Sequence, residues 1–189
     1  MRLYSNTVYG VVNAIDEIFN QDRYADRVIE KTLRSNPKWG ARDRAFIAES
    51  VYEMVRWWRL INTISPSDDL FHLFATYWLM QGHELPPWKE FQGSSTADMK
   101  FRYNAITDRA VLQSIPDWLD AMGAKLLGEK WPMELDSLNR QAEVVLRVNT
   151  LKTSREDLMK RLQEEGIETY APKGYKDALV LSRRQNVFR

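Results

Sequence analysis

The sequence predicts a mainly α-helical protein: an all-α bundle over residues 1–143, followed by a small α+β unit over residues 144–189. Apolar residues recur at helical spacings from Ser5 to about Gln141, without an internal repeat. At Val144 the period changes from 3.6 residues to 2, which is typical of strands. This change of period marks the expected domain boundary.

The first part of the bundle is expected to contain three helices. In "TVYGVVNAIDEIF", Val8, Val11 and Ile15 fall on one face of a helix. The segment "RYADRVIEKTLRSNP" continues the pattern until Pro37 stops it. The segment "RDRAFIAESVYEMVRWWRLINTI" is then expected to form one long helix with a buried stripe.

The fourth helix is expected in "SPSDDLFHLFATYWLMQG". Ser65 suits the N-cap, Pro66 the first helical position and Gly82 the end of the helix. From Leu70 to Met80 the segment is apolar nearly all round, so it should be the central buried helix.

The rest of the bundle is expected to be shorter elements. Residues 82–98 are rich in Gly, Pro and Ser and predict a loop. Helical patterns follow over about 99–112, from a cap at Ser114, and over about 132–142. The bundle therefore has roughly seven expected helices.

The C-terminal unit is expected to have the order β-α-β-β. Val144, Leu146 and Val148 share one face of the first strand. The helix after it has two possible capping boxes, Thr153 with Glu156 or Ser154 with Asp157. Leu158 and Leu162 are expected on the inner face of this helix, and Gly166 is expected at its end. The two later strands are expected in "IETYA" and "DALVLS".

Composition excludes several kinds of site. The 189 residues include no cysteine, so disulfides, thiolate metal sites and cysteine nucleophiles are excluded within this sequence. Only His72 and His83 are present, and His72 is expected to be a hydrogen-bonded core or boundary residue. We expect neither a metal site nor a catalytic residue here. The sequence also lacks a long apolar run and a signal peptide, so a cytoplasmic location is expected.

Basic residues gather at both ends of a chain whose net charge is only +1. Residues 1–63 hold ten basic and eight acidic side chains, 64–143 hold seven and twelve, and 144–189 hold ten and six. Arginine and lysine bind phosphates, and aromatic rings stack on bases, so this pattern suits RNA; a solvated face with internal ion pairs is the alternative. Trp58, beside these residues, is expected in the core. The candidate RNA-binding residues of the bundle are Arg23, Arg27, Lys31, Arg34, Lys38, Arg42, Arg44, Arg56 and Arg59.

A second candidate group lies on the first strand of the C-terminal unit and just after it. Arg147, Asn149 and Lys152 stay available on the polar side of the pattern. Small open sheets present such faces to single-stranded RNA, or use them to dock on another domain. The pattern leaves both possibilities open.

Three segments together resemble a known enzyme family. "ARDRAFIAESVYEMVRW" looks like the signature R-D-R-x-F-[IL]-x-x-x-V-[YF]-x-x-x-R, and "SIPDWL" looks like S-x-P-x-W-L. "LRVNTLKTSREDLMKRLQEEGIE" is similar to R-V-N-[TP]-L-K-x-[ST]-x-E-x-L-x-x-x-L-x-x-x-G-[IV]. In this order they resemble the N-terminal region of the RsmB/NOP2/Sun family, the S-adenosylmethionine-dependent RNA cytosine-5 methyltransferases.

The resemblance implies a NusB-like helical domain, then a ferredoxin- or RRM-like unit, then a methyltransferase domain. That last domain carries the cofactor loop and two catalytic cysteines in the family, and this sequence has neither. The chain is therefore expected to position rRNA for a catalytic domain that it lacks, and to bind no cofactor itself. S-adenosylmethionine and the missing domain are expected partners of the full-length parent.

Two alternatives remain open. The chain could be a stand-alone NusB-like RNA-binding or antitermination module, which a stop codon directly after codon 189 would indicate. It could also be a helical protein-interaction scaffold, for which no salt-dependent RNA binding is expected.

Overall fold

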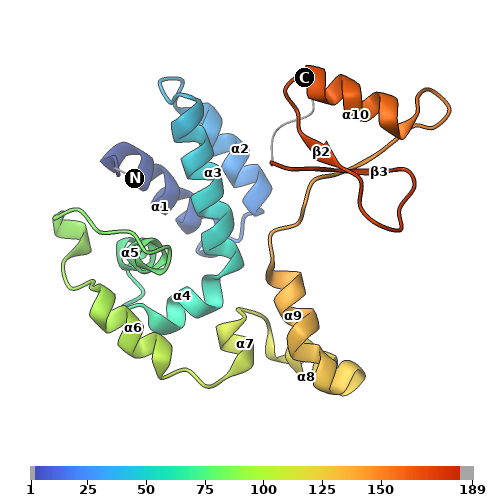
Figure 1. The fold of residues 1–189 in the computed structure, drawn as a ribbon. Helices are drawn as coiled ribbons and strands as arrows, with labels where there is room; N and C mark the ends of the chain where they lie inside the picture. The colour runs from blue at the N-terminus through green and yellow to red at the C-terminus, as the bar shows by residue number, and fades with distance from the viewer. Residues whose placement is uncertain (1–2, 184–189) are drawn as a thin grey trace. The chain divides into compact units, whose positions relative to one another are not determined.

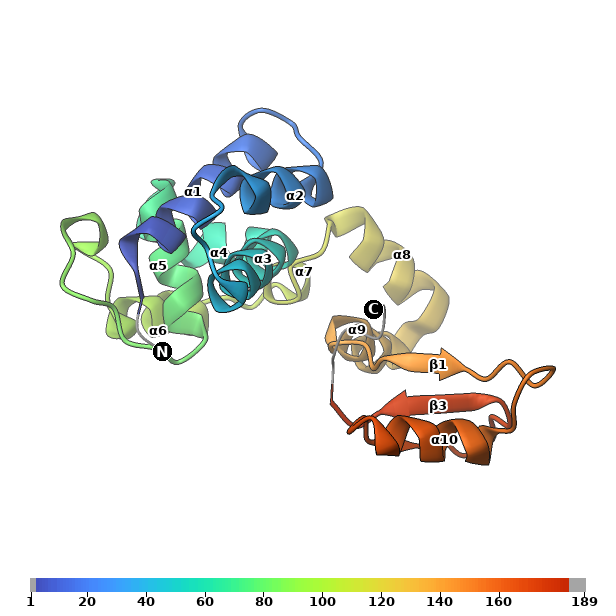
Figure 2. The same cartoon turned by 90° about the horizontal axis from the view of Figure 1, so that it is seen from above.

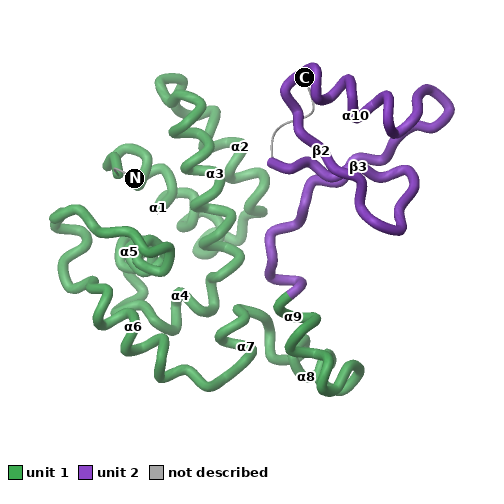
Figure 3. The backbone as a smooth tube through the Cα atoms, viewed as in Figure 1, with its two compact units in different colours: residues 1–136 green, residues 137–189 purple. Residues whose placement is uncertain are grey.

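Figure 1 shows the fold of the chain, a computed structural model that describes residues 3–183. By its internal contacts the chain divides into two compact units, Met1–Asp136 and Ser137–Arg189 (Figure 3), and each is described here by itself. Unit 1 is helical, and unit 2 contains a small antiparallel sheet and a helix, so the predicted fold class is confirmed. The division falls between residues 136 and 137, whereas the change of sequence period falls between residues 143 and 144.

Unit 1 is built from α-helices, most of which are joined by short loops. The loop that leads from α5 to α6 contains a 3₁₀ turn, η1, and a second 3₁₀ turn, η2, precedes α9, in which the division between the units falls. The elements are α1 (Ser5–Phe19), α2 (Ala25–Ser35), α3 (Ala41–Arg56), α4 (Trp58–Ile64), α5 (Leu70–Met80), η1 (Lys89–Phe91), α6 (Thr96–Asn104), α7 (Arg109–Leu112), α8 (Asp117–Leu127), η2 (Gly128–Lys130) and α9 (Trp131–Asn139).

The core of unit 1 forms where α1, α3 and α5 pack together. Every residue of α5 from Leu73 to Leu79 is buried, which confirms the expected central helix. Ile15 of α1, Ile47 of α3 and Phe74 of α5 are fully buried in one cluster. Burial of each such side chain contributes about 1.5–3 kcal/mol, so this cluster fixes the positions of the outer helices.

The prediction of one long third helix is wrong, because the helix is broken at Trp57 into α3 and α4. This residue ends α3 and precedes α4, with φ −103° and ψ 19°. Its indole Nε1 donates to the Glu53 carboxylate at 3.2 Å. Trp58 stacks on Phe19, with the two ring centroids 3.7 Å apart, and it is partly buried against the core cluster rather than inside it.

Helix α5 begins later than the sequence suggested. Asp69, not Ser65, is its N-cap, and its carboxylate accepts from the backbone N–H groups of Phe71 and His72. His72 contacts Ser67 Oγ at 2.6 Å and the Gln92 carbonyl at 3.0 Å. His72 is thus a hydrogen-bonded boundary residue, as the sequence predicted.

The helices α7, α8 and α9 share a small core of their own. It contains Ala110, Ile115, Trp131 and Leu135, and the predicted single helix over 99–112 is instead divided into α6 and α7. Gly123 of α8 lies directly against the Trp131 ring. This close approach requires a residue without a β-carbon at position 123.

Unit 2 has the predicted order β1 (Val145–Arg147), α10 (Arg155–Glu164), β2 (Thr169–Tyr170) and β3 (Ala178–Leu181). The strand order in space is β1-β3-β2, and β3 is antiparallel to both neighbours. The strands β1 and β2 are therefore parallel, and α10 connects them across β3. This is a split β-α-β motif, the half-unit of a ferredoxin-like fold.

The sheet packs against α10, which runs along it (Figure 2). Leu146 pairs with Leu179 and Val145 with Val180, so alternate side chains point to opposite faces as predicted. On the β2 edge, the Tyr170 hydroxyl donates to Glu143 at 2.8 Å, and this contact raises the Tyr170 pKa. In β3 itself, the successive residues Leu179, Val180 and Leu181 are all buried.

Helix α10 uses Ser154, from the second of the two candidate capping pairs, as its N-cap. Ser154 Oγ accepts from the Asp157 backbone N–H at 3.0 Å and donates to the Asp157 carboxylate at 2.6 Å. At the other end Gly166 has φ +77°, the conformation that terminates a helix. Leu158 and Leu162 of α10 are half-buried.

Candidate nucleic-acid interface

The basic stripe of α2, defined as Arg27, Lys31 and Arg34, lies on the exposed side of the helix. Lys31 pairs with Glu17 at 2.8 Å, and Arg34 pairs with Glu30 one turn earlier at 2.7 Å. Arg27 is exposed and has no ion pair among residues 3–183. Exposed ion pairs contribute only about 0–1 kcal/mol, so a phosphate can displace either carboxylate.

Three other basic residues extend this surface. Arg23 lies just before α2, Lys38 follows α2, and Arg42 opens α3. All three side chains are exposed, and within the part of the chain described here they form no ion pair. Each can therefore reach a phosphate.

Arg44 has a structural role instead. Its guanidinium donates to the backbone carbonyls of Leu33, Asn36 and Trp39, the last at 2.9 Å. The Leu33 carbonyl belongs to the last turn of α2, where helices leave carbonyls without an internal partner. Arg44 thus holds the α2–α3 connection, and its donors are already committed.

Arg59 and Arg56 also make contacts within unit 1. Arg59 donates to the Ile115 carbonyl and to the Asp117 carboxylate, both at 2.6 Å, so it ties α4 to the start of α8. The Arg56 guanidinium lies over the Trp57 ring, 5.5 Å from its centroid. The bundle candidates therefore separate into an exposed group around α2 and a group that stabilises unit 1.

In unit 2 the three candidates lie on or near β1. Arg147 is exposed at the end of the strand, and Lys152 is exposed in the following loop. Asn149 Oδ1 accepts from the Leu151 backbone N–H at 3.2 Å, and the Asn149 carbonyl accepts from Lys152 and Thr153. The side-chain oxygen of Asn149 therefore shapes the loop, which leaves the amide NH₂ as the group that can bind a ligand.

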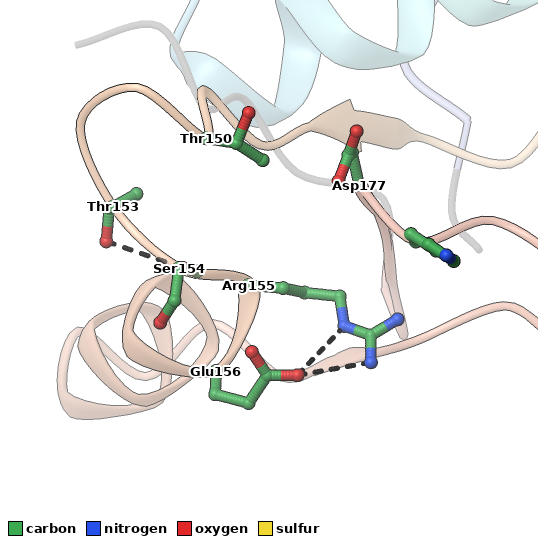
Figure 4. Close-up of a pocket in the computed structure, with 7 residues that line it drawn as sticks. Thr150, Thr153, Ser154, Arg155, Glu156 and Asp177 are labelled. Atoms are coloured by element: carbon green, nitrogen blue, oxygen red, sulfur yellow. Dashed lines mark hydrogen bonds and ion pairs between the residues drawn. The ribbon is translucent and has the colours of Figure 1, made fainter.

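An open hollow of about 390 Å³ lies beside this loop. Figure 4 shows Thr150 and Thr153 on one side of it, Asp177 on the other, and Arg155 held against Glu156 at 3.1 Å. The Glu156 pKa is lowered, first by its own backbone N–H and then by Arg155. The first turn of α10 is thus already occupied by acidic side chains.

The structure brings a further basic segment to this hollow that the sequence interpretation did not single out. Lys176 lines the hollow, and Lys173 and Tyr175 belong to the same β2–β3 loop. The signal was present in the sequence as "KGYKD", with a turn-forming glycine between two lysines.

Other kinds of site are not indicated in residues 3–183. No group of three or more His, Asp or Glu side chains in this range could hold a metal ion. No helix in the same range has the length and apolar character needed to span a bilayer. Asp120 accepts hydrogen bonds from Arg109 and Trp131, and Arg109 holds the Asp120 pKa below its usual range. This network joins α7, α8 and α9.

Comparison with known proteins supports part of the expected relationship. Residues 115–188 match a family model described as "Methyltr_RsmF/B-like, ferredoxin-like domain". The match covers α8, α9 and the β-α-β-β unit, and so supports an N-terminal region of the RsmF/B type. The helical part before residue 115 lies outside it. A comparison with curated proteins gives no match.

One solved structure is similar over nearly the whole chain. It is described as "Crystal Structure of PH0851", with a TM-score of 0.59 and 14% sequence identity over 98% of this chain. At this identity the likeness concerns the fold alone. The chain spans half the length of that protein, since the similarity covers 50% of it.

Proposed function

We propose that this chain is the RNA-recognition region of an RsmB/NOP2/Sun-type enzyme that methylates C5 of a cytosine in rRNA. The observation that carries the proposal is the match of residues 115–188 to the RsmF/B-like ferredoxin-like domain. The split β-α-β topology of unit 2 agrees with that description. A NusB-like character for the helical bundle is part of the same proposal.

The proposed role is to hold RNA rather than to transform it. Around α2, unit 1 offers six exposed basic side chains that, within residues 3–183, form either no ion pair or only a weak surface ion pair. The lysines would bind phosphates as point charges and the arginines through paired hydrogen bonds. Such contacts position RNA without reading its sequence. The six residues are Arg23, Arg27, Lys31, Arg34, Lys38 and Arg42.

The residues of this chain do not fit the cofactor chemistry of the proposed parent. A covalent mechanism at cytosine C6 requires a thiolate, and the 189 residues contain no cysteine. They also contain no glycine-rich nucleotide-binding motif. We therefore assign S-adenosylmethionine binding and methyl transfer to a separate catalytic domain, and derive no catalytic step from this chain.

The test is RNA binding measured by fluorescence anisotropy at two salt concentrations, with rRNA fragments as probes. Phosphate contacts make the logarithm of affinity fall linearly with the logarithm of salt, by about 0.7–0.9 per contact. Replacing Arg27, Lys31 and Arg34 together with alanine should weaken binding and reduce this slope by roughly 2 to 3. The matched control replaces three exposed lysines of unit 1 on other elements, Lys89, Lys100 and Lys125.

Two results would contradict the proposal. If the triple variant of the α2 stripe and the control bound RNA equally well, the stripe would have no role. If the chain bound no RNA at either salt concentration, a protein-interaction scaffold would be the better reading. Calorimetry adds a separate check, since tight S-adenosylmethionine binding by this chain alone would contradict the assignment of the cofactor to another domain.

A further inference from the structure

Two loops come together at one end of unit 2. The β1–α10 loop, residues 149–153, follows β1, and the β2–β3 loop, residues 172–177, precedes β3. The Val148 backbone N–H donates to the Asp177 carbonyl at 2.7 Å, and Arg147 pairs with Ala178. Because β1 and β3 are antiparallel neighbours, the end of one strand lies beside the start of the other, and Figures 1 and 2 show both loops at this end. We call this surface the loop end.

The hollow of about 390 Å³ lies between these two loops, with Thr150 and Thr153 on one side and Asp177 on the other, and Lys176 also lines it. The N-terminus of α10 does not make it an anion site. Ser154 Oγ already accepts a hydrogen bond from one of the backbone N–H groups there, and two acidic side chains occupy the first turn. Any ligand must therefore be held by the loops.

The loops are basic and carry an exposed aromatic ring. Lys152, Lys173 and Lys176 are exposed and form no ion pair within residues 3–183. Tyr175 is 69% exposed, and Leu151 at the tip of the other loop is 96% exposed. An aromatic side chain left in water between two lysines has no part in the core of unit 2.

We infer that the loop end binds an unpaired segment of RNA, with Tyr175 stacked on a base and the three lysines on the adjoining phosphates. This inference rests on the proposed function and names the form of RNA that unit 2 takes. Every base offers a face on which an aromatic ring can stack, but in a duplex those faces are covered by neighbouring bases. The threonine hydroxyls of the hollow can form hydrogen bonds with the edge of a splayed base.

The experiment uses the whole chain with two fluorescent probes, a short mixed-sequence single-stranded RNA and the same strand annealed to its complement. Tyr175→Ala should reduce affinity for the single strand about tenfold, because the loss of stacking on one base typically lowers affinity by roughly that factor. Tyr175→Phe should retain the affinity. Tyr103→Ala, at an exposed tyrosine of α6, is the matched control and should have no effect.

The lysines are tested through the salt slope. Replacing Lys173 and Lys176 with alanine should reduce the slope by about 1.4 for a single strand. Lys160→Ala, at an exposed lysine in the middle of α10, is the control, and it should change the slope by less than the value of one phosphate contact, about 0.7. Circular dichroism of each variant checks that unit 2 remains folded, and exposed loop substitutions are expected to leave it so.

Each outcome separates this inference from the proposed function. If Tyr175→Ala binds the single strand as well as the unchanged protein does, or if the duplex binds equally well, the inference is wrong. In that case a loss of binding in the α2 variant would leave the proposed function standing. If no variant and no probe shows binding, both fail together.

Discussion

The Asp120 network makes the sharpest prediction about what holds α7, α8 and α9 together. Asp120 accepts two hydrogen bonds from Arg109, at 2.8 and 2.9 Å, and one from the Trp131 indole Nε1 at 2.7 Å. In an Asp120→Ala variant the Arg109 guanidinium can turn to water. The Trp131 indole cannot, because the residue is only 4% exposed. An unpaired buried donor costs about 1–3 kcal/mol, and this is the expected loss of local stability.

Hydrogen exchange followed by mass spectrometry measures this loss in the peptides that cover α7 to α9. A loss of that size speeds exchange there by roughly 5- to 150-fold, while peptides from α1 and α5 keep their protection. Glu129→Ala, at an exposed carboxylate in η2, is the control. Equal exchange in the Asp120 variant and this control would refute the reasoning, since it would mean that the indole had found water.

The same network has a defined pH dependence. Arg109 lowers the Asp120 pKa in the folded state, and an unfolded aspartate has a pKa of about 3.9. The stability from the ionised carboxylate is therefore present above about pH 4 and is lost as the pH falls through the folded-state pKa. The free energy of unfolding of Asp120→Asn should be lower than that of the unchanged protein at neutral pH. This difference in free energy should shrink as the pH falls. A difference that stays constant from neutral pH to pH 2 would contradict this.

Three further substitutions test local features, each by urea unfolding. Arg44→Ala should destabilise unit 1 by about 1–3 kcal/mol, because the carbonyls of Leu33, Asn36 and Trp39 each lose a hydrogen bond, and Arg44→Lys should restore only part of this. Gly123→Ala should cost about 1–3 kcal/mol, because a β-carbon there overlaps the Trp131 ring; unchanged stability would show that the ring can move. Ser154→Ala should cost about 0.5–2 kcal/mol and Thr153→Ala much less, and the reverse order would indicate the other capping box.

Local patterns predicted the elements whose structure is decided locally. The apolar run of α5 has no polar face, so burial was its only stable solution, and the alternation in β1 predicted which of its side chains share one face of the sheet. The break at Trp57 carries no such signal, because no glycine or proline stands there. It arises from packing against other helices, which a single segment does not record.

The basic residues show the same limit at the candidate site. Arg27, Lys31 and Arg34 recur at helical spacing along α2 and all three are exposed, so helix geometry alone brings them together. Spacing could not reveal that Arg59 would meet Asp117, 58 residues later, because that contact depends on how the bundle closes. Similarly, Lys173 and Lys176 join the β1–α10 loop only through the antiparallel pairing of β1 with β3.

The strand order of unit 2 has a consequence for its folding during synthesis. The strands β1 and β2 do not pair with each other, and both pair only with β3, the last strand within residues 3–183. Val145 must find Val180, which is made 35 residues later. A nascent chain that has reached the end of α10 therefore holds a helix with one half-buried face but no sheet to cover it. Closure of the sheet becomes possible only when Leu181 has left the ribosome, and every hydrogen bond between strands then forms around that final strand.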